Sequence, residues 1–511
     1  MTRRMLIGLD IGTSGAKCLL ADETGRVIAS ATREYPLSTP RPGWAEQNPE
    51  DWWRGAADGI RAVLAKAGAD AKDICGVSFS GQMHGLVALD AEMRVIRPAI
   101  LWCDQRTQKQ CDWITGRAGG VEGLLRYTNN RMLTGYTGGK LLWLRDEEPE
   151  NFARMKIFCC PKDYIRFRLT GRVLTDVSEA SGTGFFDTKN RVWADGLIAL
   201  AGLDKAIFPK AVESTALAGC VTAEAAAETG LPEGLNVYAG GGDAVIQTTG
   251  TGLVEPGVLG VVIGTSGNVS MGMSGFHANP EGNLQMFCNN EPGLWHAFGC
   301  TLTAGGAFSW FVKTLAGEDA ADAAREGKNT YAYIDERVKN VPAGANGVLF
   351  APYLTGERCP YPDPNARGIF YGLSLGTTRA DMARAVMEGV TYSLKQVVEL
   401  MSAEIAPQKV YLSGGGASSE VWKQMAADIF ELPVYTMSAA KEGGAYGAVL
   451  VAGVGAGLWK NLSEAVQVIK PETECTPIAE NQEGYRKSYE IYKKIYLALK
   501  PVYDFGASLG F

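Results

Sequence analysis

The chain has 511 residues, a length that corresponds to two or three domains. Its 49 basic and 56 acidic residues give a net charge of −7, which excludes a generally basic protein that binds nucleic acid over a broad face. With 46% hydrophobic and 21% charged residues, the composition is that of a globular protein with a large core and excludes a mainly disordered chain.

The first half of the sequence predicts an α/β pattern. An apolar strand ends at a Gly-Thr-Ser-Gly turn (residues 12–15), a second strand follows, and a hairpin reverses at residues 23–25. Asn48 and Pro49 predict the start of a helix, because Asn is a favoured capping residue and Pro is favoured at the first helical position. A second helix is predicted at residues 162–169. Further strands are predicted at residues 75–80, 86–90, 96–102 and 156–160.

The second half continues the pattern. The residue spacing predicts a strand at 409–412 and helices at 303–315, 379–401, 419–430, 444–454 and 483–500. The helix at 444–454 consists mainly of small residues, so we expect it to pack closely against another element. The last helix carries Tyr485, Tyr489, Tyr492 and Tyr496 on one stripe, which indicates core packing rather than a binding site.

A short internal repeat connects the two halves. The sequence Gly-Thr-Ser-Gly follows an apolar strand at residues 12–15 and again at 264–267, and each copy precedes another strand-like run. Either turn alone would be interpreted as an ordinary tight hairpin, because its residues are common in turns. Two copies in the same context predict two similarly built domains, 1–250 and 251–511, that face one cleft.

The two turns also predict phosphate binding. Backbone N–H groups of such a turn can point into one concavity and bind an anion. Asp10 shortly precedes the first turn, where its carboxylate could hold Mg²⁺ directly or through water. The pair of turns together with Asp10 therefore favours a metal–polyphosphate ligand such as Mg-ATP. The chain has no Gly-x-x-x-x-Gly-Lys-Ser/Thr sequence and is not a P-loop enzyme.

A run of three glycines, 240–242, leads from a predicted strand at 235–239 to Asp243. Ordering each glycine costs about 1 kcal/mol relative to Ala, so we expect the backbone here to approach another group closely. Asp243 would lie at the carboxyl edge of a strand, where α/β proteins bind ligands. A helix follows it, so capping is the alternative role, but the glycine run favours catalysis.

Two other segments are candidates for ligand contact. Residues 82–84 (Gln-Met-His) form a loop at a strand end, where neutral His and Gln can bond polyol hydroxyls and Met can contact C–H faces. Trp102, Asp104 and Arg106 end the next strand and could line the same pocket, although Asp104 and Arg106 could equally form a structural ion pair. Residues 414–416 (Gly-Gly-Gly) lie between a strand and a helix, a setting that suits a flat ligand such as a nucleobase.

The cysteines and the apolar segments indicate where in the cell the protein is located. The eleven cysteines are scattered without a Cys-x-x-Cys pair, which predicts reduced thiols in a cytoplasmic protein. The three histidines (His84, His277 and His296) form no close cluster in the sequence, so we predict no zinc site built from His and Cys. Asp10 interrupts the first apolar run, so we expect no signal peptide, and no stretch approaches the roughly 20 apolar residues that span a bilayer.

With these features the chain resembles, over nearly its whole length, the FGGY carbohydrate kinases of the actin-like ATPase superfamily. Residues 135–147 (Gly-Tyr-Thr-Gly-Gly-Lys-Leu-Leu-Trp-Leu-Arg-Asp-Glu) are similar to the first signature of that family. Residues 368–373 (Gly-Ile-Phe-Tyr-Gly-Leu), with Asp381, Met382 and 385–388, are similar to the second. The resemblance implies an α/β fold with two actin-like (ribonuclease H-like) ATPase domains flanking a central cleft.

Within the family, residues 82–85 and 101–104 are most similar to the members that phosphorylate xylulose, whereas residues 42–47 are shared more widely. Glycerol kinases differ, because they carry an Arg-Glu pair where this chain has Met83 and His84. The resemblance implies ATP-dependent phosphorylation of D-xylulose to D-xylulose 5-phosphate. One departure is Ala244, where some relatives have a polar residue.

The resemblance assigns Asp243 as the general base and Asp10 to metal and phosphate. The predicted site residues, grouped by role, are Asp243 and Asp10 for catalysis, with Asp10 as the metal ligand; Gln82, Met83, His84, Trp102, Asp104 and Asp243 for the sugar; and Gly12, Thr13, Ser14, Gly264, Thr265, Gly305, Gly415, Gly416 and Ala417 for the nucleotide.

Three alternatives stay open at this point. Another kinase of the family could act on ribulose, gluconate or erythritol. An actin-like ATPase without a small-molecule acceptor gives no reason for the loop at 82–84. A binding scaffold that has lost catalysis is disfavoured, because Asp10 and Asp243 are both present. The predicted partners are a sugar and ATP, with no nucleic acid and no membrane, and the chain could form a homodimer.

Overall fold

The computed structural model describes residues 4–402, 405–438 and 441–510, and its contacts divide the chain into two compact units. Unit 1 comprises Met1–Glu255, Gly272–His296 and Ala439–Lys470; unit 2 comprises Pro256–Met271, Ala297–Ser438 and Pro471–Phe511. The first segment of unit 1 thus ends close to the predicted boundary at residue 250, and two later segments also belong to this unit. The division into 1–250 and 251–511 stays a prediction.

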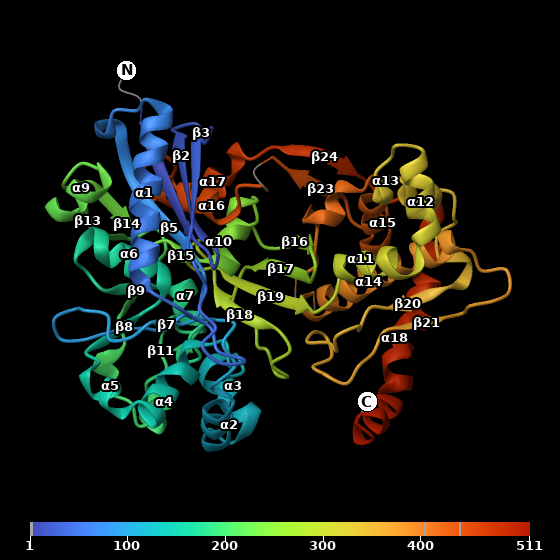
Figure 1. Ribbon diagram of the computed structural model, residues 1–511, viewed down its shortest axis with the longest axis horizontal. Coiled ribbons are helices and arrows are strands. Elements are labelled where there is room, and N and C mark those ends of the chain that lie inside the picture. The colour runs from blue at the N-terminus through green and yellow to red at the C-terminus, as the bar shows by residue number, and fades with distance from the viewer. Residues whose placement is uncertain (1–3, 403–404, 439–440, 511) are drawn as a thin grey trace. The chain divides into compact units, whose positions relative to one another are not determined.

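Unit 1 is built on a mixed sheet (Figure 1). Strand β1 pairs with β2 in antiparallel and with β5 in parallel orientation, and the turn of residues 12–15 joins β1 to β2. The strands of this sheet are, in order, β13 (Leu217–Cys220), β14 (Asn236–Tyr238), β5 (Ile74–Gly81), β1 (Met5–Ile11), β2 (Gly15–Asp22) and β3 (Val27–Glu34), with β15 (Gly241–Gly242) also paired to β5.

Helix α1 (Pro49–Ala67) covers one face of this sheet. It begins as predicted, because the Asn48 side chain accepts a hydrogen bond from the Glu50 N–H and Pro49 is the first helical residue. Leu9 and its register partner Cys18 point toward α1, since a Cβ on Gly59 of the helix would lie 3.2 Å from the Cβ of Cys18. The apolar side chains between them form a buried core.

Helix α16 (Gly443–Gly455) covers the opposite face. Gly8 and Asp10 alternate with Leu9, so they point away from α1 and toward α16. A Cβ on Gly8 would lie 2.1 Å from the Ala445 carbonyl oxygen, and one on Gly447 would lie 2.0 Å from that of Ile246. The predicted close packing of this small-residue helix is therefore confirmed: it lies between the sheet and α10 (Asp243–Gly250).

Shorter elements complete unit 1. Its other helices are α2 (Gln108–Arg117), α3 (Gly120–Thr128), α4 (Thr137–Glu147), α5 (Pro149–Arg154), α6 (Pro161–Thr170), α7 (Val177–Ser181), α8 (Asp195–Leu200), α9 (Ala223–Thr229) and α17 (Leu462–Ala465). Its small strand pairs are β4 (Glu46–Gln47) with β7 (Ala99–Ile100), β6 (Val87–Leu89) with β8 (Ile157–Cys159), β9 (Leu174–Asp176) with β12 (Lys210–Val212), and β10 (Phe186–Asp187) with β11 (Val192–Trp193). Strand β18 (Gln285–Cys288) packs against α7.

Unit 2 repeats the same local plan around the second turn. Strand β16 is antiparallel to β17 and parallel to β22, as β1 is to β2 and β5. The strands run in the order β19 (Trp295–Thr301), β17 (Gly267–Met273), β16 (Val258–Ile263), β22 (Lys409–Ser413), β23 (Val434–Met437) and β24 (Pro471–Cys475); β20 (Leu349–Ala351) and β21 (Ile369–Tyr371) form a separate pair. The repeat predicted from sequence is thus present in the strand pairing of both units.

The helices of unit 2 are α11 (Gly305–Leu315), α12 (Gly317–Arg325), α13 (Thr330–Val338), α14 (Arg379–Met401), α15 (Glu420–Phe430) and α18 (Ala479–Ser508). Helix α14 has the bounds that the sequence predicts. The tyrosines Tyr485, Tyr489, Tyr492 and Tyr496 of α18 are buried in one apolar cluster, which confirms that the stripe is core. Within the described residues, no helix combines the length and apolar character needed to cross a membrane.

Candidate active site

Asp10 lies near the end of β1, on the side of the sheet that faces α16. The Ser80 hydroxyl donates a hydrogen bond of 2.7 Å to Asp10 Oδ1, and a Cβ on Gly444 would lie 3.1 Å from the Asp10 carboxyl carbon. Burial raises the pKa of Asp10, although the Ser80 bond and the charge of Lys17 oppose this effect. The side chain stays partly exposed, so the carboxylate can reach a ligand.

Asp243 is the first residue of α10, and Gly242 occupies the capping position before it. Its Oδ1 accepts a hydrogen bond of 2.8 Å from the N–H of Ala244, and Met83 provides a second backbone hydrogen bond. Burial and, to a smaller extent, the charge of Asp10 raise the pKa of Asp243 to about 7. A partly exposed carboxylate with such a pKa is suited to accept a proton near neutral pH.

The Asp10 carboxylate, the predicted metal ligand, is compatible with a magnesium site completed by substrate phosphates and water. Among the residues that the structure describes, no three His, Cys, Asp or Glu side chains lie close enough to hold a metal ion together. Mg²⁺ usually binds one or two carboxylates and completes its shell with waters and substrate phosphates. The donor set around Asp10 is compatible with that mode.

The first Gly-Thr-Ser-Gly turn is tied to the predicted sugar segments. The Thr13 hydroxyl donates to Gln82 Oε1 (3.2 Å) and accepts from the Trp102 indole N–H (2.9 Å). The Gln82 amide also donates to the Gly12 carbonyl oxygen at 3.3 Å. The structure thus brings Gly12 and Thr13 together with Gln82 and Trp102, while Ser14 is exposed beside them.

The Met83–His84 segment lies directly beside Asp243. A Cβ on Gly242 would lie 2.6 Å from Met83 Cγ and Sδ, so the glycine run lets the two loops touch, as predicted for it. The His84 ring packs 4.6 Å from the Tyr136 ring. Burial and the nearby Lys140 lower the pKa of His84 to about 3, so its imidazole is neutral and can bond hydroxyl groups in either direction.

Asp104 and Arg106 form the ion pair that the sequence left open, at 2.6 Å. Asp104 is fully buried and also accepts a hydrogen bond of 2.7 Å from the Ala45 N–H. The guanidinium of Arg106 lies 3.5 Å over the Trp44 ring and 2.8 Å from Glu46. This network supports the loop that carries Trp102, and direct sugar contact by Asp104 stays a prediction.

The second turn gathers the predicted nucleotide residues of unit 2. The Gly305 N–H donates to the Gly264 carbonyl oxygen (2.7 Å), and the Gly306 N–H donates to that of Thr265 (3.1 Å). Gly414 has a φ of 83°, and a Cβ there would lie 2.6 Å from the Ile263 carbonyl oxygen. The segment of Gly415, Gly416 and Ala417 is a short 3-10 helix beside this strand end.

Two residues that hold the first turn were missed by the sequence analysis. Gln47 donates from its amide to the Thr13 carbonyl oxygen (2.7 Å), and the Tyr35 hydroxyl donates to that of Gly12 (2.6 Å). Gln47 belongs to the widely shared segment 42–47, which was a usable signal. Nothing in the local sequence distinguishes Tyr35.

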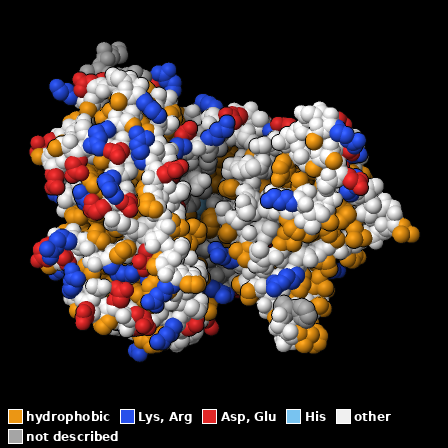
Figure 2. All heavy atoms as spheres, viewed as in Figure 1, with side chains coloured by type: hydrophobic (Ala, Val, Ile, Leu, Met, Phe, Trp, Pro, Cys, Tyr) orange, Lys and Arg blue, Asp and Glu red, His pale blue; other side chains and the backbone are white. Residues whose placement is uncertain are grey.

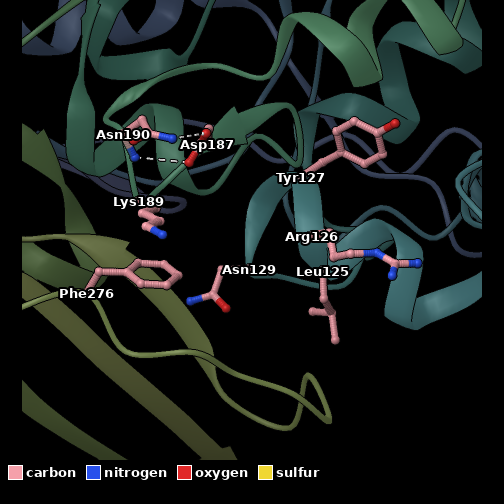
Figure 3. A pocket seen from close by; sticks show the side chains of 8 residues that line it. All are labelled: Leu125, Arg126, Tyr127, Asn129, Asp187, Lys189, Asn190 and Phe276. Atoms are coloured by element: carbon pink, nitrogen blue, oxygen red, sulfur yellow. Dashed lines mark hydrogen bonds between the residues drawn. The ribbon is translucent and has the colours of Figure 1, made fainter.

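A separate pocket of about 250 Å³ in unit 1 contains none of the predicted site residues (Figure 3). The Lys189 ammonium lies 5.6 Å from the Phe276 ring, and Asn190 donates two hydrogen bonds to Asp187. Both polar ends of the Asn129 side chain are bonded to the backbone of residues 277 and 279. Most polar groups here are therefore already engaged. The lining residues are Leu125, Arg126, Tyr127, Asn129, Asp187, Lys189, Asn190 and Phe276.

Comparison with protein families decides the classification. Residues 5–250 match the N-terminal domain of the FGGY family of carbohydrate kinases, and residues 259–456 match its C-terminal domain. The chain belongs to the FGGY family. The predicted fold class and the predicted family are both confirmed. As an FGGY kinase, the protein is a phosphotransferase that uses an alcohol group as acceptor, with a sugar and ATP as its small-molecule substrates.

Individual relatives are similar along almost the full chain. Xylulose kinase from Bacillus subtilis (strain 168) is 37% identical over 97% of this chain and 97% of its own length. The crystal structure of xylulose kinase from Rhodospirillum rubrum has a TM-score of 0.89 at 33% identity, covering 98% of this chain and all of that one. The structure of gluconate kinase from Lactobacillus acidophilus has a TM-score of 0.90 at 27% identity, covering 98% and 99%.

Proposed function

We propose that the protein transfers the γ-phosphoryl group of ATP to the C5 hydroxyl of D-xylulose and so forms D-xylulose 5-phosphate and ADP. The observation that carries this proposal is the contact between the Asp243 loop and the Met83–His84 segment, because the Asp243 carboxylate then lies next to groups predicted to bind sugar. The similarity to xylulose kinases over 97% of the chain supports xylulose as the acceptor.

Asp243 acts as the general base in this mechanism. Its carboxylate accepts the hydroxyl proton while the C5 oxygen bonds to the γ-phosphorus and the bond from phosphorus to the ADP oxygen breaks. The pKa of about 7 supports this role. Near neutral pH a large fraction of the molecules carry Asp243 as the carboxylate, and a base of this strength still accepts a proton in the reaction.

The other predicted residues bind and orient the substrates. Asp10 holds Mg²⁺, which when bound neutralises charge on the phosphate oxygens. Backbone N–H groups of the turns at 12–15 and 264–267 bind phosphate groups of ATP, and residues 415–417 hold the adenosine. Met83 and neutral His84 contact the sugar, whose alignment with the γ-phosphate provides much of the rate acceleration.

Asp243→Asn tests the base. We expect kcat to fall by at least a hundredfold with little change in ATP affinity, since the amide keeps the shape but cannot take up the proton. A coupled ADP assay with D-xylulose and a nucleotide-binding titration measure the two quantities. Asp195→Asn is the matched control, because Asp195 also begins a helix (α8) but forms a surface ion pair with Lys205 at 2.6 Å. Unchanged turnover in Asp243→Asn would exclude the base assignment.

A panel of acceptors tests the substrate. D-xylulose should give the highest kcat/KM among pentuloses, hexuloses, gluconate, erythritol and glycerol. Gluconate belongs in the panel because a gluconate kinase is among the similar structures. A higher kcat/KM with another acceptor would reassign the substrate within the family, and ATP hydrolysis that no sugar changes would favour the ATPase alternative.

The cytoplasmic location and a homodimer stay predictions. All eleven cysteines are free thiols in the structure. Large hydrophobic side chains are exposed on unit 2, and Figure 2 shows such side chains at the surface where Figure 1 places β21 and α18. A dimer would be sought first at these residues: Tyr371, Leu373, Leu375, Leu497, Val502, Phe505 and Leu509.

A further inference from the structure

His84 has a backbone conformation that non-glycine residues rarely adopt. Its φ is 72°, in the left-handed region, and a residue stays there only when its surroundings hold it. The residue before it, Met83, bonds to Asp243 through its backbone. A change in the His84 peptide would therefore move both the sugar loop and the proposed base.

The His84 carbonyl group is held by two donors from α4. The Lys140 ammonium donates to this oxygen at 2.7 Å and also to the carbonyl oxygen of Gly135, and the Thr137 hydroxyl donates to the His84 oxygen at 3.1 Å. Lys140 is fully buried, and it donates these hydrogen bonds to backbone carbonyl oxygens. Burial lowers its pKa to about 7. The hydrogen bonds to these two carbonyl oxygens satisfy the buried amine, and the charge of Asp104 partly opposes the effect of burial on its pKa.

The His84 N–H group is held from the other side by α7. It donates to Glu179 Oε1 at 3.0 Å, and Glu179 is fully buried with Lys162 3.7 Å from its other oxygen. The neighbouring Ser178 hydroxyl oxygen accepts a hydrogen bond of 3.0 Å from the Gly242 N–H. Two adjacent residues of α7 thus hold the sugar loop and the glycine run before Asp243.

The His84 ring is also confined. It packs against Tyr136, and a Cβ on Gly182 would lie 2.4 Å from its Cε1. Tyr136, Thr137 and Lys140 all belong to the 135–147 signature, so one sequence motif contacts both the ring and the carbonyl group of His84.

We propose that Lys140 and Thr137, opposed by Glu179, are positioning residues that clamp the His84 peptide and preset the sugar loop for its substrate. This inference rests on the proposed function, because it assumes that the loop binds the acceptor. Lys140 and Thr137 touch neither sugar nor nucleotide in this scheme. They act through the His84 carbonyl oxygen.

The test compares Lys140→Met with the milder Thr137→Val, which removes one hydroxyl at nearly constant shape. We expect the KM for D-xylulose to rise about tenfold in Lys140→Met and about threefold in Thr137→Val, while the KM for ATP changes less than about twofold. The two KM values are measured in the same coupled ADP assay. An unchanged sugar KM in Thr137→Val would overturn the proposal even if Lys140→Met did not fold.

A double-mutant cycle with His84→Gly separates positioning from a general structural role. Gly adopts a positive φ freely and lacks the ring, so in this background each substitution should raise the sugar KM less than about twofold further. Effects as large as in the parent protein would mean that Lys140 and Thr137 do not act through His84. If none of the sugars in the panel increased ADP release by the parent enzyme, the proposed function itself would fail. That result is distinct from a failure of the positioning role.

Discussion

The two Gly-Thr-Ser-Gly turns have the same sequence but different surroundings. In unit 1, four side chains bond to the turn. Tyr35 and Gln47 donate to its carbonyl oxygens, Gln82 accepts from the Thr13 hydroxyl, and Trp102 donates to that hydroxyl. In unit 2, the turn is bonded by backbone N–H groups at the start of α11, from residues 304–306.

The two turns also differ in the residue that precedes them on the strand and in the exposure of their threonine. Asp10 lies two residues before Gly12, whereas Val262 lies two residues before Gly264. Thr13 is half-buried and bonded, whereas Thr265 is exposed and its hydroxyl has no hydrogen-bond partner among the described residues. The duplicated turn thus has two settings: the first copy follows a strand that carries Asp10 and is bonded by side chains, including Gln82 of the predicted sugar loop, whereas the second is bonded by backbone N–H groups.

The largest effect should follow from removing the carboxylate that distinguishes the first strand. Asp10→Asn is expected to lower kcat about a hundredfold and to raise the Mg²⁺ concentration for half-maximal rate, because an amide binds the metal weakly. A Mg²⁺ titration of the ADP-release rate measures both. Val262→Thr, at the equivalent position of unit 2, is the control and should stay within about twofold. Full activity in Asp10→Asn would remove the functional difference between the two strands.

A smaller effect should follow from disturbing the backbone site of unit 2. A Cβ on Gly305 would lie 2.7 Å from the Gly264 carbonyl oxygen, so Gly305→Ala must shift the turn. We expect the KM for ATP to rise about tenfold and the KM for the sugar to stay unchanged. Gly317→Ala is the matched control, because Gly317 also begins a helix (α12) and a Cβ there meets nothing within 4 Å. A sugar-specific defect in Gly305→Ala would contradict the assignment of this turn to the nucleotide.

The smallest effect concerns stability. Thr13→Val removes a hydroxyl bonded to Gln82 and Trp102, so the free energy of unfolding should fall by about 1 kcal/mol. Thr265→Val removes an exposed, unbonded hydroxyl and should change it by less than about 0.5 kcal/mol. Urea titrations of both variants give the comparison. Equal losses would show that the side-chain bonds of the first turn contribute nothing to its stability.

Local signals in the sequence sufficed for much of the fold. Asn48 and Pro49 gave the start of α1, and the capping box of Thr378 and Asp381 accounts for the start of α14 at residue 379. The repeated turn identified the two related sheets because strand, turn and strand are adjacent in the chain. The last helix was predicted too short, at 483–500, and the structure extends it past Pro501, a residue that normally ends a helix. It continues to Ser508, since tertiary contacts hold the last turns: Tyr503 is buried and donates to the Arg367 carbonyl oxygen.

The candidate site was predictable to the extent that its residues sit in distinctive turns. Asp10, Asp243 and residues 82–84 could be found in this way, and the structure brings them together in unit 1. Lys140 lay within a recognised signature, but its bond to the His84 carbonyl oxygen depends on a fold that no local pattern describes. The strand predicted at 96–102 is limited to Ala99–Ile100, because its ladder partner β4 has only two residues, Glu46 and Gln47.

The packing of α16 has a consequence for biosynthesis. This helix comes from residues 443–455, yet it covers the sheet formed by the first strands of the chain, with Gly8 against the Ala445 carbonyl oxygen. A nascent chain that has left the ribosome only as far as Glu255 has the strands and α1 but lacks α16, so the apolar surface on the α16 face stays open until translation is nearly finished. The early half of this protein should therefore depend on chaperones during synthesis more than a domain encoded by one continuous segment would.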